Sequence, residues 1–482
     1  MTTRRELVAA LQAIAGRENV LWRREDLLVY EFDGTVQKQT PDAVVLPADA
    51  AETAEIVRLC NRQRVPITPR GAGTGLSGGA VPTRRGVVIA TARMREIFEL
   101  DPVNQVAVVG PGLANLQLSE AAAAHGLFFA PDPSSQKACT IGGNVAENAG
   151  GPHCLALGVT QNHVIGLEVV TAGGEITWLG GRTPEAPGYD LRGAFIGSEG
   201  TLGITTKVAV RLLPLPASVV TLLAIFDGVE QASETVSAII GAGMVPAALE
   251  MMDRLTIQAA EAGLKCGYPP GAGAVLLIEL DGVAHLANEQ ATRAREACLA
   301  SGATEVRVAT DAQERAALWR GRKHAIGALG HIAPNYYILD GVVPRSRLVE
   351  VMARVSAIGT EHGLAIANVF HAGDGNLHPC ILFDSRQAGA TERVLKAGGE
   401  IMRACVDAGG ALSGEHGIGY EKQNYMRWLF SDVDLENMGR LRPVFGNHGD
   451  FNPCKVLPSG AGCGELARQQ SAMRAAGPDA YV

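Results

Sequence analysis

Residues 69–79 read Pro-Arg-Gly-Ala-Gly-Thr-Gly-Leu-Ser-Gly-Gly, and the rest of the chain is organised around this glycine-rich loop. Five of its eleven residues are glycine, and each glycine costs roughly 0.5–1 kcal/mol relative to alanine when the backbone becomes ordered. Such a loop is typical of a backbone that approaches a ligand closely and aims its N–H groups at an anion, with Thr74 and Ser77 as further donors. A glycine turn without a ligand is the alternative.

The loop does not fit the two commonest phosphate-binding motifs. A phosphate-loop NTPase requires Gly-Lys-Ser/Thr at the end of the loop, and residues 69–79 contain no lysine. A Rossmann fingerprint requires Gly-x-Gly-x-x-Gly, a helix that follows at once, and an acidic residue about 20 positions further on. Here the glycines at 71, 73 and 75 alternate, Pro82 follows, and no clear helix begins at the loop. The loop alone therefore leaves the anion unidentified.

The composition excludes several classes of protein. The 482 residues, with 47% hydrophobic and 19% charged side chains, are typical of a globular chain of two or three domains. A formal net charge of −8 without a basic cluster argues against nucleic acid and anionic lipid as partners. We expect no signal peptide and no transmembrane helix. The nine scattered cysteines lack a Cys-x-x-Cys pair, which argues against an iron–sulfur cluster in this chain and favours a cytoplasmic protein.

Hydrophobic periodicity predicts an α+β chain in two parts. An amphipathic helix near the N-terminus is followed by alternating strands and helices, and a hairpin is expected at 164–179. A proline pair at 214–216 indicates a domain boundary. Beyond it, units of strand and helix recur, with a helix predicted at 316–330 and a strand at 366–371.

Two segments of the C-terminal half carry histidines between glycines. Residues 368–379 read NVFHAGDGNLHP, and residues 412–419 read LSGEHGIG. The spacing of seven between His371 and His378 does not suit one turn of a helix. It favours a strand–turn–strand in which both imidazoles converge.

These histidines have two interpretations. His371, His378 and Glu415 form a His₂Glu set, which is a known arrangement for a catalytic metal with an open position, and His416 would be a free base beside it. In the alternative, the histidines cap turns and donate to backbone carbonyls. The residue types alone leave both interpretations open.

Arg322 is a candidate ligand for an anionic substrate. It lies in the sequence Trp319-Arg-Gly-Arg-Lys323 on a predicted helix. A buried arginine there would clamp a carboxylate through two parallel hydrogen bonds. The alternative is a surface ion pair, which we favour for Arg320 and Arg345.

Five motifs in fixed order resemble one protein family. They are TPRGAGTGLSGGAVP (68–82), APDPSSQKACTIGGNVAENAGGPHCLALG (130–158), GSEGTLGITTKV (197–208), FHAGDGNLHP (370–379) and SGEHGIGYEK (413–422). Together they resemble the FAD-binding subunits of bacterial glycolate oxidase, in the vanillyl-alcohol-oxidase/PCMH flavoprotein superfamily, which also holds D-lactate and D-2-hydroxyglutarate dehydrogenases. The resemblance extends from about Val29 to Pro458.

The resemblance implies an α+β fold with a PCMH-type FAD-binding domain of two subdomains. An α+β FAD-linked oxidase C-terminal domain with an antiparallel sheet would follow it. We expect a helical segment at 1–37, the FAD-binding domain at 38–217, the C-terminal domain at 218–458 and a loose tail at 459–482.

The family pattern also implies which residues bind FAD. The glycine loop would cradle the pyrophosphate, and three later segments would line the adenosine, the ribityl chain and the ring. The implied residues are Arg70, Gly71, Ala72, Gly73, Thr74, Gly75, Leu76, Ser77, Pro131, Asp132, Gly142, Gly143, Ala146, Gly150, Gly203, Ile204, Thr205 and Asn452. Cys454 stands where the family usually has glycine. Because residues 69–79 contain no histidine, we expect FAD to be bound non-covalently.

In the C-terminal part, the family pattern implies a divalent metal, Zn²⁺ or similar, on His371, His378 and Glu415. His416 would be the catalytic base, and Arg322 would bind the substrate carboxylate. D-2-hydroxyglutarate dehydrogenases carry polar residues where this chain has an apolar or weakly polar set. The set consists of Ile326, Ile338 and Cys380, and it favours a small monocarboxylate.

The resemblance therefore predicts FAD-dependent oxidation of a small 2-hydroxy acid, with glycolate to glyoxylate as the expected reaction. His416 would take the hydroxyl proton while hydride passes to flavin N5. Electrons would leave through a second flavin-fold subunit and an iron–sulfur subunit to quinone, which would place the protein in the cytoplasm or peripherally at the inner membrane. A D-lactate dehydrogenase and a non-catalytic FAD-binding scaffold are the alternatives.

Overall fold

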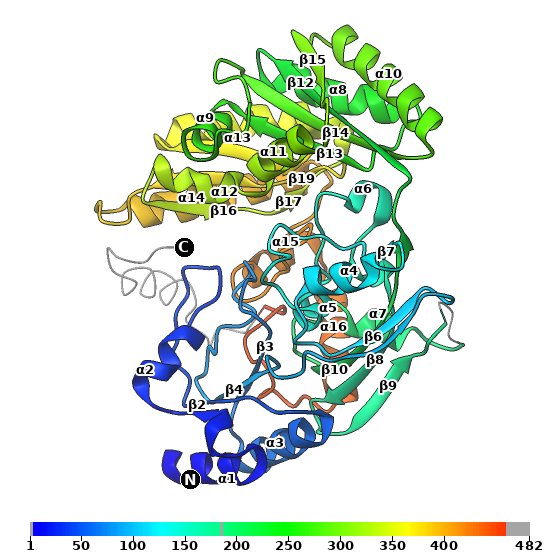
Figure 1. Cartoon of the computed structure of the whole chain (residues 1–482). Helices are drawn as coiled ribbons and strands as arrows, with labels where there is room; N and C mark the ends of the chain where they lie inside the picture. The colour runs from blue at the N-terminus through cyan, green and yellow to red at the C-terminus, as the bar shows by residue number, and fades with distance from the viewer. Residues whose placement is uncertain (1–2, 184–186, 459–482) are drawn as a thin grey trace. The chain divides into compact units, whose positions relative to one another are not determined.

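The computed structural model describes residues 3–183 and 187–458, which pack into two compact units (Figure 1). The first unit comprises residues 3–150, 159–215 and 415–458, and the second comprises 151–158 and 216–414. By packing, residues 415–458 therefore belong to the first unit. The expected loose tail at 459–482 lies outside the described residues.

The first unit begins with a four-stranded sheet that delivers the glycine loop. Its strand order is β1-β2-β4-β3, with β1 antiparallel to β2 and the other three strands parallel. Two amphipathic helices, α1 and α3, pack their apolar faces on it, and capping side chains of Thr3 and Asp49 start them. The glycine loop leaves the carboxyl end of β3, which is where open α/β sheets bind ligands. The elements are α1 (Arg4–Ala15), β1 (Val20–Leu21), α2 (Arg24–Leu27), β2 (Ala43–Val45), α3 (Ala50–Gln63), β3 (Ile67–Arg70) and β4 (Val87–Ala90).

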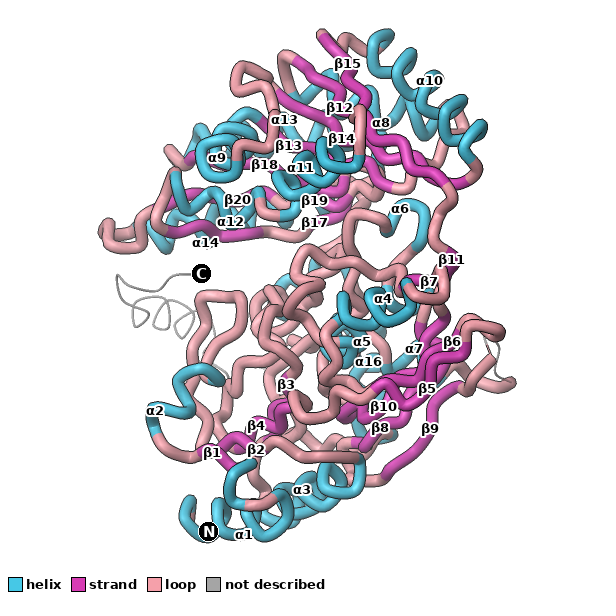
Figure 2. Tube along the Cα trace, in the orientation of Figure 1, coloured by secondary structure: helices cyan, strands magenta, loops and turns pink. Residues whose placement is uncertain are grey.

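A five-stranded antiparallel sheet forms the other half of the first unit (Figure 2). Its order is β5-β6-β10-β8-β9, and the hairpin predicted at 164–179 is the pair β8–β9. The elements are β5 (Ile97–Asp101), β6 (Val106–Val109), α4 (Asn115–Ala123), β7 (Leu127–Phe128), α5 (Ile141–Glu147), β8 (Val164–Thr171), β9 (Ile176–Gly180), α7 (Leu191–Phe195), β10 (Gly203–Arg211), β11 (Leu213–Pro214), α15 (Met426–Leu429) and α16 (Asp432–Val444).

The second unit is built on antiparallel strands between two layers of helices. The main sheet runs β15-β12-β14-β13-β18-β19-β17, and β20 joins β18 to β16. Helices α9, α11 and α12 pack on one face, and α8, α10 and α13 pack on the other. The strands are β12 (Ser218–Phe226), β13 (Ala248–Asp253), β14 (Ala274–Gly282), β15 (Glu305–Val308), β16 (Asn335–Ile338), β17 (Gly341–Val342), β18 (Ala365–His371), β19 (Asn376–Leu377) and β20 (Pro379–Phe383). The helices are α6 (Cys154–Leu157), α8 (Val229–Gly241), α9 (Arg254–Leu264), α10 (Ala284–Ala300), α11 (Ala312–Lys323), α12 (Ala325–Ala328), α13 (Leu348–His362) and α14 (Ala390–Asp407).

The structure corrects one predicted helix and adds another. The helix expected at 316–330 is broken at His324, whose φ of −105° and ψ of 7° are not helical and whose Nδ1 lies 2.9 Å from the carbonyl oxygen of Arg320. Glycines 327 and 330 weaken the helix beyond this break. The glycine-rich segment 140–151 contains α5, which Thr140 caps. The sequence did not predict this helix because its two glycines have low helix propensity.

The unusual Cys454 lies in a strained backbone conformation. Its φ of 60° belongs to the left-handed region, where a residue with a Cβ is disfavoured and glycine is not. Replacing Cys454 by Gly should therefore raise the free energy of unfolding by roughly 1 kcal/mol, measured by denaturant titration.

Cys454→Ala is the matched control, because it removes the thiol and keeps the Cβ. Equal stabilisation by Ala and Gly would show that the thiol, and not the backbone conformation, is responsible.

Candidate active site

The glycine loop presents unused backbone donors. Within residues 3–183 and 187–458, none of the backbone N–H groups of residues 71–79 donates a hydrogen bond. Glycine is required by space as well as by conformation: a Cβ on Gly71 would lie 2.6 Å from Thr140 Oγ1, and one on Gly73, whose φ is +77°, would lie 2.1 Å from Arg70 Nη2. A row of N–H groups that donate to no atom of the described residues, on a backbone rich in glycine, fits the oxygen atoms of a bound phosphate.

The Arg70 side chain supports the loop from beneath. Its Nη1 donates to the Phe32 carbonyl oxygen at 2.6 Å and its Nη2 to that of Val29 at 3.2 Å. The guanidinium also lies 5.5 Å from the centre of the Tyr30 ring. Arg70 thus ties the N-terminal segment 29–32 to the end of β3, and the buried side chain is already occupied by these partners. A contact of Arg70 with FAD stays a prediction.

The other glycine-rich segments contain buried polar atoms that lack a partner. These atoms are Asn144 Nδ2, Ser198 Oγ and Asn452 Oδ1, which have no hydrogen bond within the described part of the chain. A buried polar group without a partner costs about 1–3 kcal/mol. All three atoms belong to the first unit and lie on or beside the segments expected to hold FAD. Hydrogen bonds to a bound polar ligand would explain why these atoms have no partner in the protein. The residues of the first unit therefore fit the cofactor.

A buried carboxylate, Glu199, joins three of these segments. Its Oε1 accepts from the N–H of Ile418 and its Oε2 from that of Gly419, both at 2.6 Å. The N–H of Tyr420 donates to the carbonyl oxygen of Ser77 at 2.9 Å. Asn452 donates through Nδ2 to the carbonyl oxygens of Glu199 at 2.7 Å and of Gly79 at 3.1 Å. The stretch that begins with Glu415 is thus fastened to the glycine loop.

The surroundings of Glu199 hold further buried charges. Burial raises the pKa of Glu199 to about 7, against the lowering effect of its two backbone donors. Burial also raises the pKa of Glu147 well above its usual range, and the charge of Glu199 adds to this. Burial lowers the pKa of Lys455 to about 8, while its Nζ donates to the Val81 carbonyl oxygen at 2.6 Å. These groups form one interior charge cluster in the first unit.

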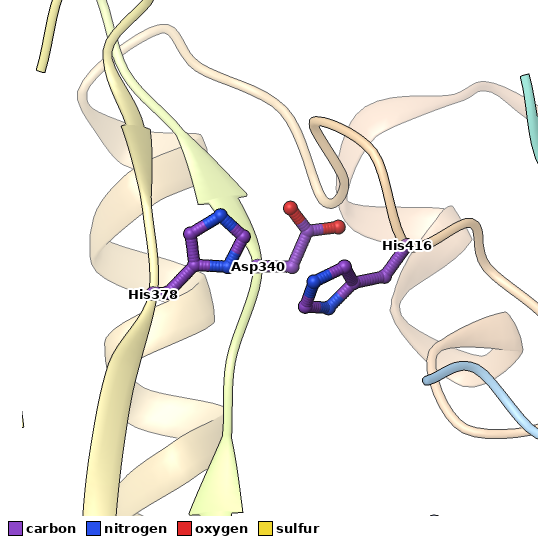
Figure 3. Close-up of side chains that lie close together, drawn as sticks. All are labelled: Asp340, His378 and His416. Carbon is purple, nitrogen blue, oxygen red and sulfur yellow. The ribbon is translucent and has the colours of Figure 1, made fainter. Parts of the chain in front are cut away.

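The second unit brings His371 and His378 together as a strand–turn–strand. His371 ends β18 and pairs with Asn376 of β19, and His378 follows directly. The two rings are perpendicular with centroids 5.2 Å apart, and each offers a ring nitrogen within 4.8 Å of the other's. The buried Asp340 offers a carboxylate oxygen within 4.8 Å of a His378 nitrogen, and Figure 3 shows these two side chains on neighbouring segments. His378 therefore lies within reach of both His371 and Asp340.

Glu250 is a site residue that the sequence reasoning missed. It lies on β13 opposite His371 of β18. His371 Nδ1 lies 2.8 and 2.9 Å from its two carboxylate oxygens, and Arg322 Nη2 lies 2.5 Å from Oε2. Side-chain exposure is 0% for Glu250 and 3% for Arg322, so Arg322 is not in a surface ion pair. The signal was one carboxylate in the apolar strand Leu249-Glu-Met-Met252.

The chain leads directly from this cluster to Glu415 and His416. Ser413 Oγ donates to Asp340 Oδ2 at 2.5 Å and the N–H of Gly414 donates to Oδ1 at 3.1 Å. Gly414 is the last residue of the second unit that the structure describes, and Glu415 is the first residue after the return to the first unit. His416 Nε2 lies 3.8 Å from Glu415 Oε1. The ion pair expected for Arg345 is not found among the described residues, and its Nη1 donates to the carbonyl oxygen of Gly373 at 3.0 Å.

Comparison with known proteins now defines the class. Residues 41–180 match the family described as FAD binding domain, and residues 215–456 match the FAD linked oxidases, C-terminal domain. The chain therefore belongs to the FAD-linked oxidases and is an FAD-dependent oxidoreductase. This confirms the predicted family, the predicted fold class and FAD as the cofactor.

Curated relatives place it more closely. This chain is 46% identical to the glycolate oxidase subunit GlcD of Escherichia coli K12. The alignment of 461 residues covers 95% of this chain and 92% of the relative. The GlcD protein of Bacillus subtilis is 40% identical over 93% of this chain and 96% of its own. A D-lactate dehydrogenase of Archaeoglobus fulgidus is 34% identical, in an alignment that covers 89% of this chain and 95% of the relative.

Solved structures support the fold. p-Cresol methylhydroxylase with substrate bound matches with a TM-score of 0.79 at 18% identity, over 94% of this chain and 96% of that one. A 4-ethylphenol oxidase from Gulosibacter chungangensis matches with the same TM-score over 94% and 97%. Within the described residues, no helix combines the length and the apolar composition needed to cross a membrane.

The raised pKa of Glu199 predicts how stability depends on pH. Between pH 4.5, its usual pKa, and about 7, the folded protein binds more protons at this site than the unfolded chain. The free energy of unfolding should therefore fall as the pH rises through this interval. Glu199→Gln removes this contribution, so the stability advantage of the wild type over the variant should be larger at pH 5 than at pH 7.5 by roughly 2 kcal/mol.

Denaturant titration at the two pH values measures this difference. Glu6→Gln is the control, because the pKa of the exposed Glu6 is lowered by hydrogen bonds from Thr3 and its contribution has the opposite sign. A wild-type advantage over Glu199→Gln that does not change with pH would refute the assignment.

Proposed function

We propose that this protein oxidises a small 2-hydroxy acid and that its reaction is glycolate to glyoxylate. The observation that carries the proposal is the buried cluster of Arg322, His371 and His378 in the second unit. It occurs in a chain that is 46% identical to a glycolate oxidase subunit. Buried cationic and imidazole side chains are the groups needed to bind a carboxylate and to handle a hydroxyl proton.

FAD, when bound, supplies the two-electron acceptor of this oxidation. We propose that the first unit holds it through the unused N–H groups of residues 71–79 and through the segments around Asp132, Gly142, Ala146 and Gly203. Gly203, whose φ is +157°, lies so close to β8 that a Cβ would be 2.5 Å from the carbonyl oxygen of Val170. The absence of histidine from residues 69–79 supports non-covalent binding.

A divalent cation such as Zn²⁺ is proposed to bind His371, His378 and Glu415. The two imidazoles are within reach of one ion. Glu415 directly follows Gly414, whose N–H donates to Asp340 at 3.1 Å, and it is the proposed carboxylate ligand. When bound, the cation supplies a Lewis acid that acidifies the substrate hydroxyl.

Three side chains have proposed roles toward the substrate. Arg322 binds the carboxylate, and its buried Nε, which has no acceptor within the described residues, is a donor that remains for this purpose. His416 accepts the hydroxyl proton. Ile338 lies opposite Cys380 on neighbouring strands, and these apolar neighbours favour a substrate without a second carboxylate.

Electrons must leave the reduced protein through another carrier. We propose a second flavin-fold subunit and an iron–sulfur subunit that deliver them to quinone, with the complex peripheral at the inner membrane. The GlcD relatives are named as subunits, which supports partner chains. The nine cysteines of this chain include no Cys-x-x-Cys pair that would hold a cluster.

Substrate identity is tested by anaerobic flavin bleaching. Glycolate should bleach the visible flavin absorption faster than D-lactate, and D-2-hydroxyglutarate should bleach it least, because its second carboxylate would be desolvated against Ile338 and Cys380. A faster reaction with D-lactate would identify a D-lactate dehydrogenase. No bleaching by any of the three would favour the non-catalytic scaffold.

The role of His416 is tested by stopped-flow flavin reduction. His416→Ala should slow reduction by glycolate roughly 10²–10⁴-fold, since a positioned base contributes about this factor, while FAD content stays normal. His285→Ala, an exposed histidine on α10, should react at the wild-type rate. Reduction of the His416→Ala protein at a near-normal rate would end the assignment.

A further inference from the structure

We propose that Glu250 is a positioning residue that fixes His371 and Arg322 together and thereby selects Nε2 of His371 as the atom that binds the cation. This inference rests on the metal site of the proposed function. Glu250 belongs to none of the motifs discussed above and would itself contact neither the cation nor the substrate.

The backbone sets the geometry of this contact. Glu250 of β13 is the register partner of His371 of β18 in an antiparallel pair, and the next pairs are Met251 with Phe370 and Met252 with Val369. All of these residues are buried. The sheet, rather than a mobile loop, therefore holds the carboxylate against the imidazole.

A carboxylate in such a place requires strong partners. Glu250 has a side-chain exposure of 0%, and an unpaired charge there would be costly. Arg322, on α11, supplies the compensating charge at 2.5 Å. His371 supplies the remaining hydrogen bond through Nδ1. The three side chains form one buried cluster.

The chemistry of the donors then assigns the tautomer of His371. Arg322 cannot accept a hydrogen bond, and an ionised Glu250 can only accept. The close approach of Nδ1 to both carboxylate oxygens therefore requires the proton on Nδ1. Neutral His371 then keeps its lone pair on Nε2, the arrangement by which carboxylates orient histidine ligands of metals.

The same carboxylate couples the metal ligand to the substrate arginine. Arg322 Nη2 lies 3.4 Å from His371 Nδ1, and both atoms face Glu250. Movement of the carboxylate would displace both side chains. Glu250 thus sets the spacing between the proposed cation and the proposed carboxylate clamp.

Glu279 offers a matched control on the neighbouring strand β14. It is also a buried glutamate beside a histidine, with Oε1 3.3 Å from His153 Nε2, and it accepts from Trp319 Nε1 at 2.6 Å and from Thr221 Oγ1 at 3.0 Å. His153 is not among the proposed ligands. Loss of this carboxylate should perturb the same sheet without affecting the cation.

The experiment measures Zn²⁺ affinity of the metal-free, FAD-loaded full chain by competition with a chelator. Glu250→Gln should weaken binding about 10–100-fold, and Glu279→Gln should leave it unchanged. Glu250→Asp keeps the charge beside Arg322 but withdraws the carboxylate from Nδ1, so it should also weaken Zn²⁺ binding. This variant replaces Glu250→Gln in the test if the Gln variant does not fold. Nitrogen NMR of ¹⁵N-histidine-labelled protein should show the Nδ1-protonated tautomer of His371 in the wild type and its loss in either Glu250 variant.

The outcomes separate this inference from the proposed function. If the wild type binds Zn²⁺ and the folded Glu250 variants bind it equally well, the inference is wrong and the metal site stands. If Glu279→Gln weakens binding as much as Glu250→Gln, the effect belongs to the sheet and the inference is again wrong. If the wild type binds no Zn²⁺, Co²⁺ or Mn²⁺, the proposed metal site fails and the inference fails with it.

Discussion

The hydrogen bonds from Ile418 and Gly419 to the buried Glu199 carboxylate are the constraint on which the rest of the site depends. They fasten a chain segment that has just left the second unit to the motif Gly-Ser-Glu-Gly of the first. Glu199 has a φ of 51°, a conformation that costs a non-glycine residue energy, and the same residue donates its own N–H to the Ala146 carbonyl oxygen at 2.8 Å. The strained conformation of this buried acid is tolerated because its hydrogen bonds with Ile418, Gly419, Asn452 and Ala146 hold the residue in place.

Each unit contains a buried carboxylate that holds part of the chain in place, but the partners of the two carboxylates differ. Glu199 accepts from backbone N–H groups, which carry only partial charges, so burial still raises its pKa to about 7. Glu250 is paired with the full charge of the Arg322 guanidinium. The first arrangement fastens a loop, whereas the second fixes the positions of two side chains.

Sequence reasoning succeeded where the signal was local. The glycine loop, the hairpin β8–β9 and the turn between His371 and His378 follow from spacing and residue type within short windows. It failed where the partner is distant in sequence: Glu250 lies 121 residues from His371. The helix α5 was missed because Gly142 and Gly143 have low helix propensity, which the Thr140 cap and tertiary contacts override.

Selectivity for substrate size is separable from the binding of the carboxylate. Arg322 is already paired with the carboxylate of Glu250, and its Nε is the donor proposed to remain for one substrate carboxylate. The β16–β20 register sets Ile338 opposite Cys380, two residues from Asp340 and His378 respectively, and both side chains belong to one apolar cluster. A second carboxylate placed there would lose its hydration without gaining a partner. Under the proposed function, the strand pair and not the arginine therefore disfavours a second carboxylate on the substrate.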